Sequence, residues 1–204
     1  TVKMIIWKYS GVLWTALLLS ACLGGAQQPD AVVEDYPIAY VKRPIPINNN
    51  GDRIALDVRE VVTFNEGGDI FLRDRASPST AERNLRASLT GGLGDVKNLE
   101  VSYDGSTLWF AMRMPEIEGA DPEDQPTWNI WQYEISSDSL TRIISSDITA
   151  EAGQDIAPHY LPDGRIVFTS TRQRDAGAIL PDEGKPRFSA ETESRNGPAF
   201  VLHV

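Results

Sequence analysis

Cysteine is nearly absent from this sequence, because Cys22 is the only one in 204 residues. A disulfide within the chain is therefore impossible, and the Cys-x-x-Cys-His pattern that attaches c-type haem does not occur. The Gly-x-Ser-x-Gly pattern of serine hydrolases is missing too. The sequence thus offers no set of catalytic residues and predicts no cofactor, and whether the chain belongs to an enzyme stays open.

Histidine is scarce as well, with only His159 and His203 in the chain. A zinc or other transition-metal site would need them to converge with a carboxylate. Both histidines fall in segments that look like strands, at positions that do not obviously meet. We therefore expect structural histidines rather than metal ligands, and the sequence predicts no metal site.

Positive charge is in short supply. The chain has 19 Lys and Arg against 29 Asp and Glu, for a net charge of −10. Nucleic-acid binding requires clustered Lys and Arg to neutralise phosphates, so this balance argues against it. It argues equally against a peripheral protein held on anionic lipid by charge.

No hydrophobic run is long enough to span a bilayer as a helix. The apolar stretch at residues 12–19 follows Lys3 and Lys8, which is typical of a signal peptide. Leu19-Ser20-Ala21-Cys22 then resembles the lipobox of bacterial lipoproteins. That resemblance implies a signal peptide over residues 1–21 and lipidation of Cys22. An ordinary secretory peptide with an incidental cysteine, or a plain transmembrane anchor, are the alternatives.

Residues 22–57 are predicted to be the lipidated N-terminus and an extended linker. Pro and Gly recur in this segment, and no apolar period survives more than a few residues. Residues 36–41 are the exception, because they could form a strand that docks on the following domain.

Two segments of the chain repeat each other at a constant offset, without a gap. Each looks like a strand, an Asp-Gly turn and a second strand, since Asp closes a local hydrogen bond and Gly accepts a positive φ. The second strand of the later hairpin, residues 165–170, is expected to be buried on both faces. The matched pairs are Asp104 with Asp163, Gly105 with Gly164, Trp109 with Phe168, and Arg113 with Arg172. The alternative is two unrelated hairpins that share a common turn pair.

A short strand is expected after each hairpin, at residues 129–133 and 199–204. Residues 69–73 precede the first of these by nearly the same offset and look like the matching strand of an earlier unit. Regular spacing of this kind is the mark of a repeat architecture.

The hairpin at residues 161–172 resembles the Pro-Asp-Gly hairpin of TolB-type β-propeller repeats. Residues 113–174 further resemble bacterial lipoproteins described as hydrazine synthase alpha-subunit-like. These resemblances imply an all-β fold in which residues 58–204 form an incomplete β-propeller of about two and a half four-stranded antiparallel blades. Because the last residues form a strand pattern without a turn, we expect further blades beyond Val204.

Other segments yield local predictions. Residues 58–64 and 85–89 are expected to be strands, and residues 73–83 a surface loop. The glycine run at residues 91–94 lacks the spacing of a phosphate-binding loop and is interpreted as a connection. The acidic insert at residues 115–126 is interpreted as a solvated loop, with a calcium loop as the alternative.

The leading hypothesis is a non-catalytic binding or scaffolding module, anchored by Cys22 in the bacterial cell envelope. We expect it to lie on the periplasm-facing side of the outer membrane and to bind an envelope protein. Two alternatives place the chemistry outside this chain: the N-terminal part of a larger envelope redox enzyme, or of a propeller-gated serine peptidase.

Overall fold

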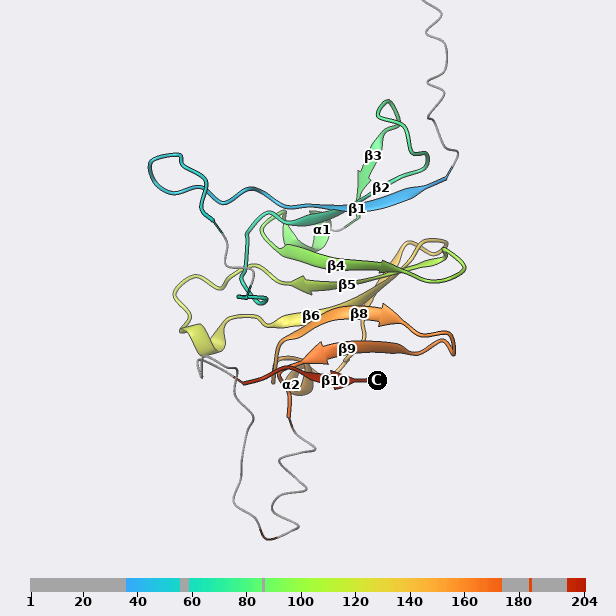
Figure 1. Ribbon diagram of the computed structural model, residues 1–204. Coiled ribbons are helices and arrows are strands. Elements are labelled where there is room, and N and C mark those ends of the chain that lie inside the picture. Colours follow the sequence, from blue (N-terminus) through green and yellow to red (C-terminus); the bar gives the residue numbers. More distant parts are fainter. Residues whose placement is uncertain (1–35, 56–58, 86, 174–183, 185–197) are drawn as a thin grey trace, which may run out of the picture.

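The protein is described by a computed structural model that covers residues 36–55, 59–85, 87–173, 184 and 198–204 (Figure 1). The predicted all-β class is confirmed, since helix within these ranges is limited to α1 (Ala87–Thr90), α2 (Asp147–Ala150) and the 3-10 turn η1 (Pro122–Asp124). No helix within these ranges is long and apolar enough to cross a membrane. The predicted signal peptide and Cys22 lie outside the described residues.

The strands in the described part of the chain form three antiparallel sheets. The first sheet has the order β1 (Ile38–Lys42), β2 (Asp69–Arg73), β3 (Glu82–Asn84). The second has the order β4 (Asp95–Val101), β5 (Thr107–Arg113), β6 (Trp128–Glu134), β7 (Ser139–Arg142). The third has the order β10 (Val201–His203), β9 (Ile166–Ser170), β8 (Asp155–Tyr160). Figure 1 shows the sheets stacked on one another in chain order.

The second sheet is the middle layer, with an apolar core on each face. Between the first and second sheets, Ile70 packs with Phe110 and other buried side chains. Between the second and third sheets, Trp109 packs with Trp128 and Phe168. Residues 107–112 of β5 are all buried, because alternate side chains of a strand enter opposite cores.

The two Asp-Gly turns are closed in the same way. In each, the glycine N–H bonds the carbonyl three residues earlier, at 2.9 Å for Gly105 and 3.0 Å for Gly164. Both glycines have positive φ, 72° and 86°. The first strand of each hairpin also carries a bulge with a left-handed residue, Asn98 in β4 and Ala157 in β8. The hairpins therefore match through the first strand and the turn.

The second strands of the two hairpins do not keep the sequence offset that relates the two Asp-Gly pairs. They are shifted from it by one residue. Glu100 lies opposite Trp109, whereas His159 lies opposite Val167, so the second loop is one residue shorter. This register gives Phe168 the place of Phe110. Trp109 points instead into the core between the second and third sheets. The gapless matching of Trp109 with Phe168, and of Arg113 with Arg172, is corrected accordingly.

The earlier unit also has a counterpart in the structure. The Leu85 N–H donates to the Ile70 carbonyl at 3.0 Å, and the Ile143 N–H donates to the Ile130 carbonyl at 3.0 Å. Since Ile70 lies on β2 and Ile130 on β6, β2 and β3 match β6 and β7. β1 then takes the place of β5. Nothing in the described part of the first sheet matches β4.

Several local predictions are corrected. The described residues 59–64 form turns rather than a strand, because the carbonyls of Val61 and Val62 accept from side chains of the second sheet. Residues 87–90 form α1 instead of a strand, and β3 falls partly in the predicted surface loop. β9 alternates between buried and half-buried residues, so it is not covered equally on both faces. β7 was not predicted.

We expect Phe110→Ala to destabilise the protein strongly. Phe110 is fully buried between the first two sheets, and truncating a buried aromatic costs about 3–5 kcal/mol of unfolding free energy. Urea denaturation monitored by circular dichroism measures this cost. The control is Ile148→Ala on α2, where the side chain is 88% exposed and the change should stay within about 0.5 kcal/mol. Equal effects of the two substitutions would contradict the layered core.

Candidate binding site

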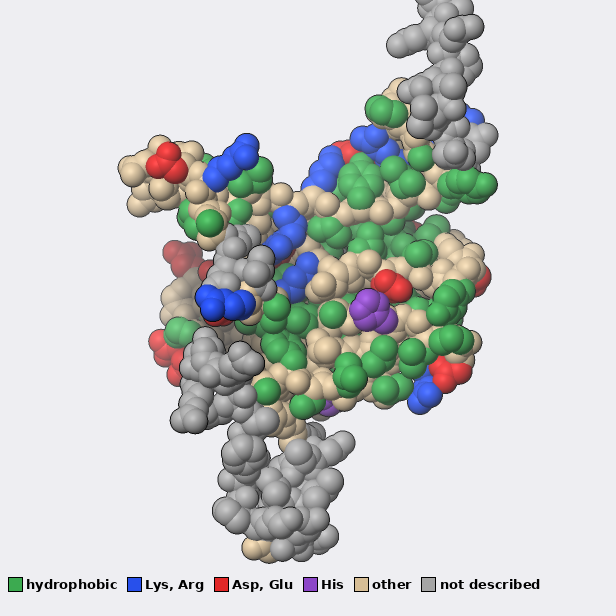
Figure 2. Space-filling view, viewed as in Figure 1, with side chains coloured by type: hydrophobic (Ala, Val, Ile, Leu, Met, Phe, Trp, Pro, Cys, Tyr) green, Lys and Arg blue, Asp and Glu red, His purple; other side chains and the backbone are tan. Residues whose placement is uncertain are grey.

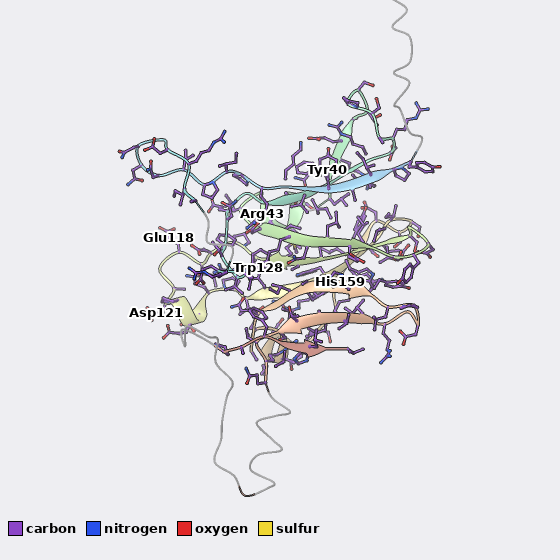
Figure 3. All side chains as sticks on the ribbon, viewed as in Figure 1. Tyr40, Arg43, Glu118, Asp121, Trp128 and His159 are labelled. Carbon is purple, nitrogen blue, oxygen red and sulfur yellow. The ribbon has the colours of Figure 1, made fainter. Side chains whose placement is uncertain are left out.

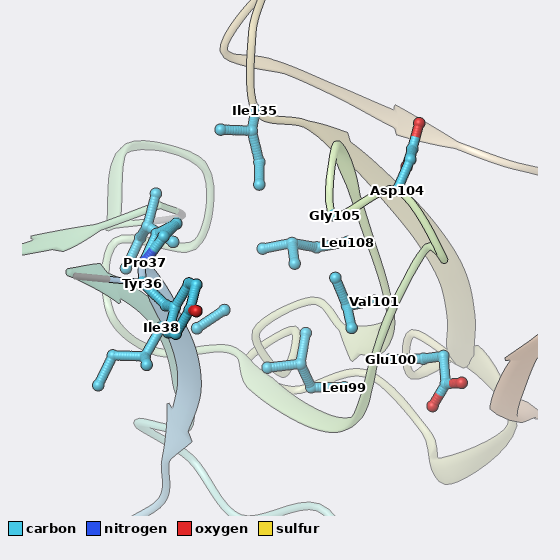
Figure 4. Close-up of a pocket in the computed structure, with 12 residues that line it drawn as sticks. Tyr36, Pro37, Ile38, Leu99, Glu100, Val101, Asp104, Gly105, Leu108 and Ile135 are labelled. Atoms are coloured by element: carbon cyan, nitrogen blue, oxygen red, sulfur yellow. The ribbon is translucent and has the colours of Figure 1, made fainter. Parts of the chain in front are cut away.

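An apolar groove lies between β1 and the near edge of the second sheet (Figure 4). Its volume is about 670 Å³, within the range of small-molecule and peptide sites. Its lining residues are Tyr36, Pro37, Ile38, Ala39, Leu72, Leu99, Glu100, Val101, Asp104, Gly105, Leu108 and Ile135. In the space-filling view, hydrophobic side chains reach the surface between these two sheets (Figure 2).

The groove is a continuation of the first core. Leu72 and Leu108 belong to the buried cluster between the first two sheets and also form the groove floor. Toward the mouth the walls become exposed, with Val101 at 52% and Tyr36 at 69% of full exposure. Apolar surface that is continuous with a core and open to solvent is typical of an interaction site.

The rim is rigid and acidic but does not enter the groove. Glu100 and Asp104 point away from the apolar walls (Figure 4). Asp104 accepts hydrogen bonds from the Ser102 hydroxyl at 2.6 Å and from the Ser106 N–H at 3.0 Å. These donors lower the pKa of Asp104 to about 2. The turn that closes one end of the groove is therefore fixed by a carboxylate that stays ionised.

Arg43, just after β1 (Figure 3), forms an ion pair with buried Asp95 that joins β1 to the second sheet. Arg43 donates two parallel hydrogen bonds to the Asp95 carboxylate, from Nε to Oδ1 at 2.8 Å and from Nη2 to Oδ2 at 2.6 Å. Asp95 is fully buried and also accepts from the Asn65 N–H at 2.7 Å. Fork-to-fork geometry of this kind sets orientation as well as energy, so it determines how far β1 stands from β4.

Lys97, two residues after Asp95 on β4, lies close to this pair. Its ammonium sits 3.7 Å from the centre of the Trp128 ring and donates to the Val61 carbonyl. Burial, and then repulsion from Arg43, lower the pKa of Lys97 to about 8. The cation–π contact and the carbonyl offset part of this cost and hold residues 61–62 against the second sheet.

The two histidines do not meet in the structure. His159 lies 3.7 Å from the Glu100 carboxylate on β4. His203 stacks on Phe168, and its Nε2 is 3.0 Å from the Arg172 carbonyl. Across the described ranges, no group of three His, Cys, Asp or Glu is placed to hold a metal ion.

The side-chain amide of Gln125 closes the acidic insert. Gln125 accepts from the Ile117 N–H at 2.8 Å and donates to the Ile117 and Ala120 carbonyls at 2.9 and 3.1 Å. Glu118 and Asp121 lie on this insert, well away from His159 (Figure 3). The Gly91–Gly94 run connects α1 to β4.

The residues predicted to define the repeat lie at the two turns and on the second strands of the hairpins, except Arg172, which follows β9. Arg113 donates to the Pro126 carbonyl at 2.6 Å, and Arg172 forms an ion pair with buried Asp155 at 2.8 Å. Burial raises the pKa of Asp155, although Ser170 and Arg172 oppose that shift. Of the eight, only Asp104 and Gly105 line the groove.

Sequence reasoning missed both Arg43 and the groove. Arg43 stands in a segment assigned to the linker, and its partner Asp95 is distant in the sequence. The one available signal was the strand pattern at residues 36–41, which β1 confirms.

No protein-family model matches the chain, and no curated protein sequence matches it. The proposal for its function therefore depends on the sequence and on the geometry above.

We expect Asp95→Ala to destabilise the protein by about 3–5 kcal/mol, because it leaves the half-buried Arg43 guanidinium without its partner. Chemical denaturation measures the loss. Arg165→Ala is the matched control, since Arg165 pairs with Asp163 on the exposed surface and such pairs contribute under about 1 kcal/mol. Similar losses in both variants would show that the ion pair does not hold β1.

Lys97 should make the protein more stable as pH rises from about 8 to 10.5. The folded state releases the Lys97 proton at about pH 8, whereas the unfolded chain keeps it to the ordinary value of 10.5. The unfolded state therefore binds more protons in that window, so the unfolding free energy increases with pH. Lys97→Met should flatten the increase, and Lys42→Met on the surface of β1 should keep it. An unchanged profile for Lys97→Met would refute this account.

Proposed function

We propose that the chain is part of a lipid-anchored binding module of the bacterial cell envelope, built on a β-propeller, that docks a partner protein. The observation that carries the binding role is the apolar groove between β1 and the second sheet. Its walls are apolar and its acidic rim residues point outward. This suits shape recognition of an apolar surface rather than acid–base chemistry.

The propeller architecture is supported by the repeat. Three antiparallel sheets stack face to face, and the strands of one sheet find counterparts in the next. Each repeat unit buries its apolar face only against a neighbour, which is how propeller blades are stabilised.

The anchor places the groove near the membrane. Only the short segment 23–35 separates Cys22 from Tyr36 at the groove mouth. A chain of that length spans at most about 50 Å when fully extended. A lipidated Cys22 would keep the groove within reach of proteins at the periplasmic face of the outer membrane.

Lipidation is tested by feeding radiolabelled palmitate to bacteria that express the full chain. We expect label in the wild type and in Ser20→Ala, which keeps a small residue before the cysteine. Cys22→Ala should carry none, because the thiol is the acceptor. Several acyl chains add about 0.8 kcal/mol per buried methylene, enough for stable attachment. Label retained in Cys22→Ala would disprove the anchor.

Partner binding is tested with a photo-crosslinking amino acid at Val101 in the groove wall or at Ile148 on α2, both exposed. We expect a discrete envelope-protein adduct from Val101 and not from Ile148. Adding Ile38→Glu on β1 should abolish the adduct. No adduct at Val101, or equal adducts at both positions, would remove the groove as the binding site.

A further inference from the structure

We propose that the groove takes an extended strand of the partner protein, added antiparallel to the free edge of β1. This inference rests on the proposed binding function and specifies what the groove binds. The strand would occupy in the first sheet the place that β4 occupies in the second. Three features of the described residues lead to it.

The first feature is the order of the strands. β1 lies opposite β2 with Val41 facing Ile70, as β5 lies opposite β6 with Ala111 facing Ile130. The strands β1, β2 and β3 of the first sheet thus correspond to β5, β6 and β7 of the second. Within the described residues, the first sheet has no strand that corresponds to β4. Among the described residues, the second edge of β1 has no neighbouring strand, so its outward N–H and C=O groups are available for pairing.

The second feature is the position of the groove. In the second sheet, β4 covers the equivalent edge and β8 packs along it from the third sheet. In the first sheet, the corresponding space is the groove, between Ile38 on β1 and Leu99 and Val101 on β4. A strand paired with the free edge of β1 would bury the exposed side chains of Ile38 and Val101.

The third feature is the chemistry of the walls. Leu99, Val101 and Ile38 are apolar, and the floor continues into the core. Backbone pairing gives a peptide affinity, and pockets for alternate side chains give it selectivity. The ligand is therefore a strand about as long as β8 or β4, with apolar side chains at alternate positions.

A partner strand fits better than a second copy of this chain. Pairing two β1 edges would place two first sheets side by side and leave Leu99 and Val101 uncovered. A single inserted strand covers both the edge and the wall.

The test uses hydrogen exchange of the full chain in detergent micelles. The probe is a capped peptide that copies β4, Asp-Val-Lys-Asn-Leu-Glu-Val. We expect saturable slowing of exchange in residues 38–42 and no change in residues 128–134. A peptide with Pro in place of its Leu should give no slowing, because Pro lacks the N–H needed for the ladder.

Two exposed positions provide matched variants. Val101→Glu in the groove wall should weaken peptide binding at least tenfold, and Ile148→Glu on α2 should leave it unchanged. Because both side chains are exposed, neither change should unfold the protein, which thermal melting checks.

Three results would overturn the proposal. The peptide does not slow exchange in residues 38–42. A second such result would be slow exchange in residues 38–42 without peptide at every protein concentration, which would show that the chain covers the edge itself. A third would be exchange that slows without peptide as protein concentration rises, which would show that a second copy covers the edge. A groove adduct at Val101 without edge protection would leave the binding function intact and exclude only the strand.

Discussion

The rest of the structure depends on the burial of the second sheet on both faces. β5 places every side chain from Thr107 to Met112 in one of two cores, so this sheet is stable only between two others. Buried apolar surface contributes roughly 25 cal/mol per Å², and β5 buries such surface in both cores. The three sheets therefore depend on one another. Each outer sheet is held by the apolar side chains that it packs against the middle sheet.

Two fully buried carboxylates stand at the starts of strands in neighbouring sheets. Asp95 and Asp155 begin β4 and β8, and both are fully buried. Their arginine partners differ: Arg43 reaches Asp95 from another sheet, whereas Arg172 follows the second strand of Asp155's own hairpin. Buried pairs contribute more to geometry than to net stability. The pair between Arg43 and Asp95 accordingly fixes the spacing between β1 and β4. The groove is the space between these two strands on the far side of the pair.

The sequence predicted the strands whose signals are local. The Asp-Gly turns located two hairpins, and apolar runs located β2, β6 and β10. β3 and β7 are the shortest strands of their sheets, too short for a periodic pattern. The register past Gly164 depends on a loop that is one residue shorter, which spacing alone does not show. Arg43 and the groove could not be predicted, because a contact between residues so far apart in the chain follows from how sheets stack.

Asn98 shows how the chain tolerates changes of length. Val96 and Leu99 contact the same core, although residues three apart in a regular strand face opposite ways. The bulge at Asn98 absorbs the extra residue. A relative that lacked this one residue would keep every other side chain of β4 on its present face, as a regular strand. A deletion away from the bulge would move the residues on one side of it to the opposite face, so evolutionary loss of a residue in β4 is expected at Asn98.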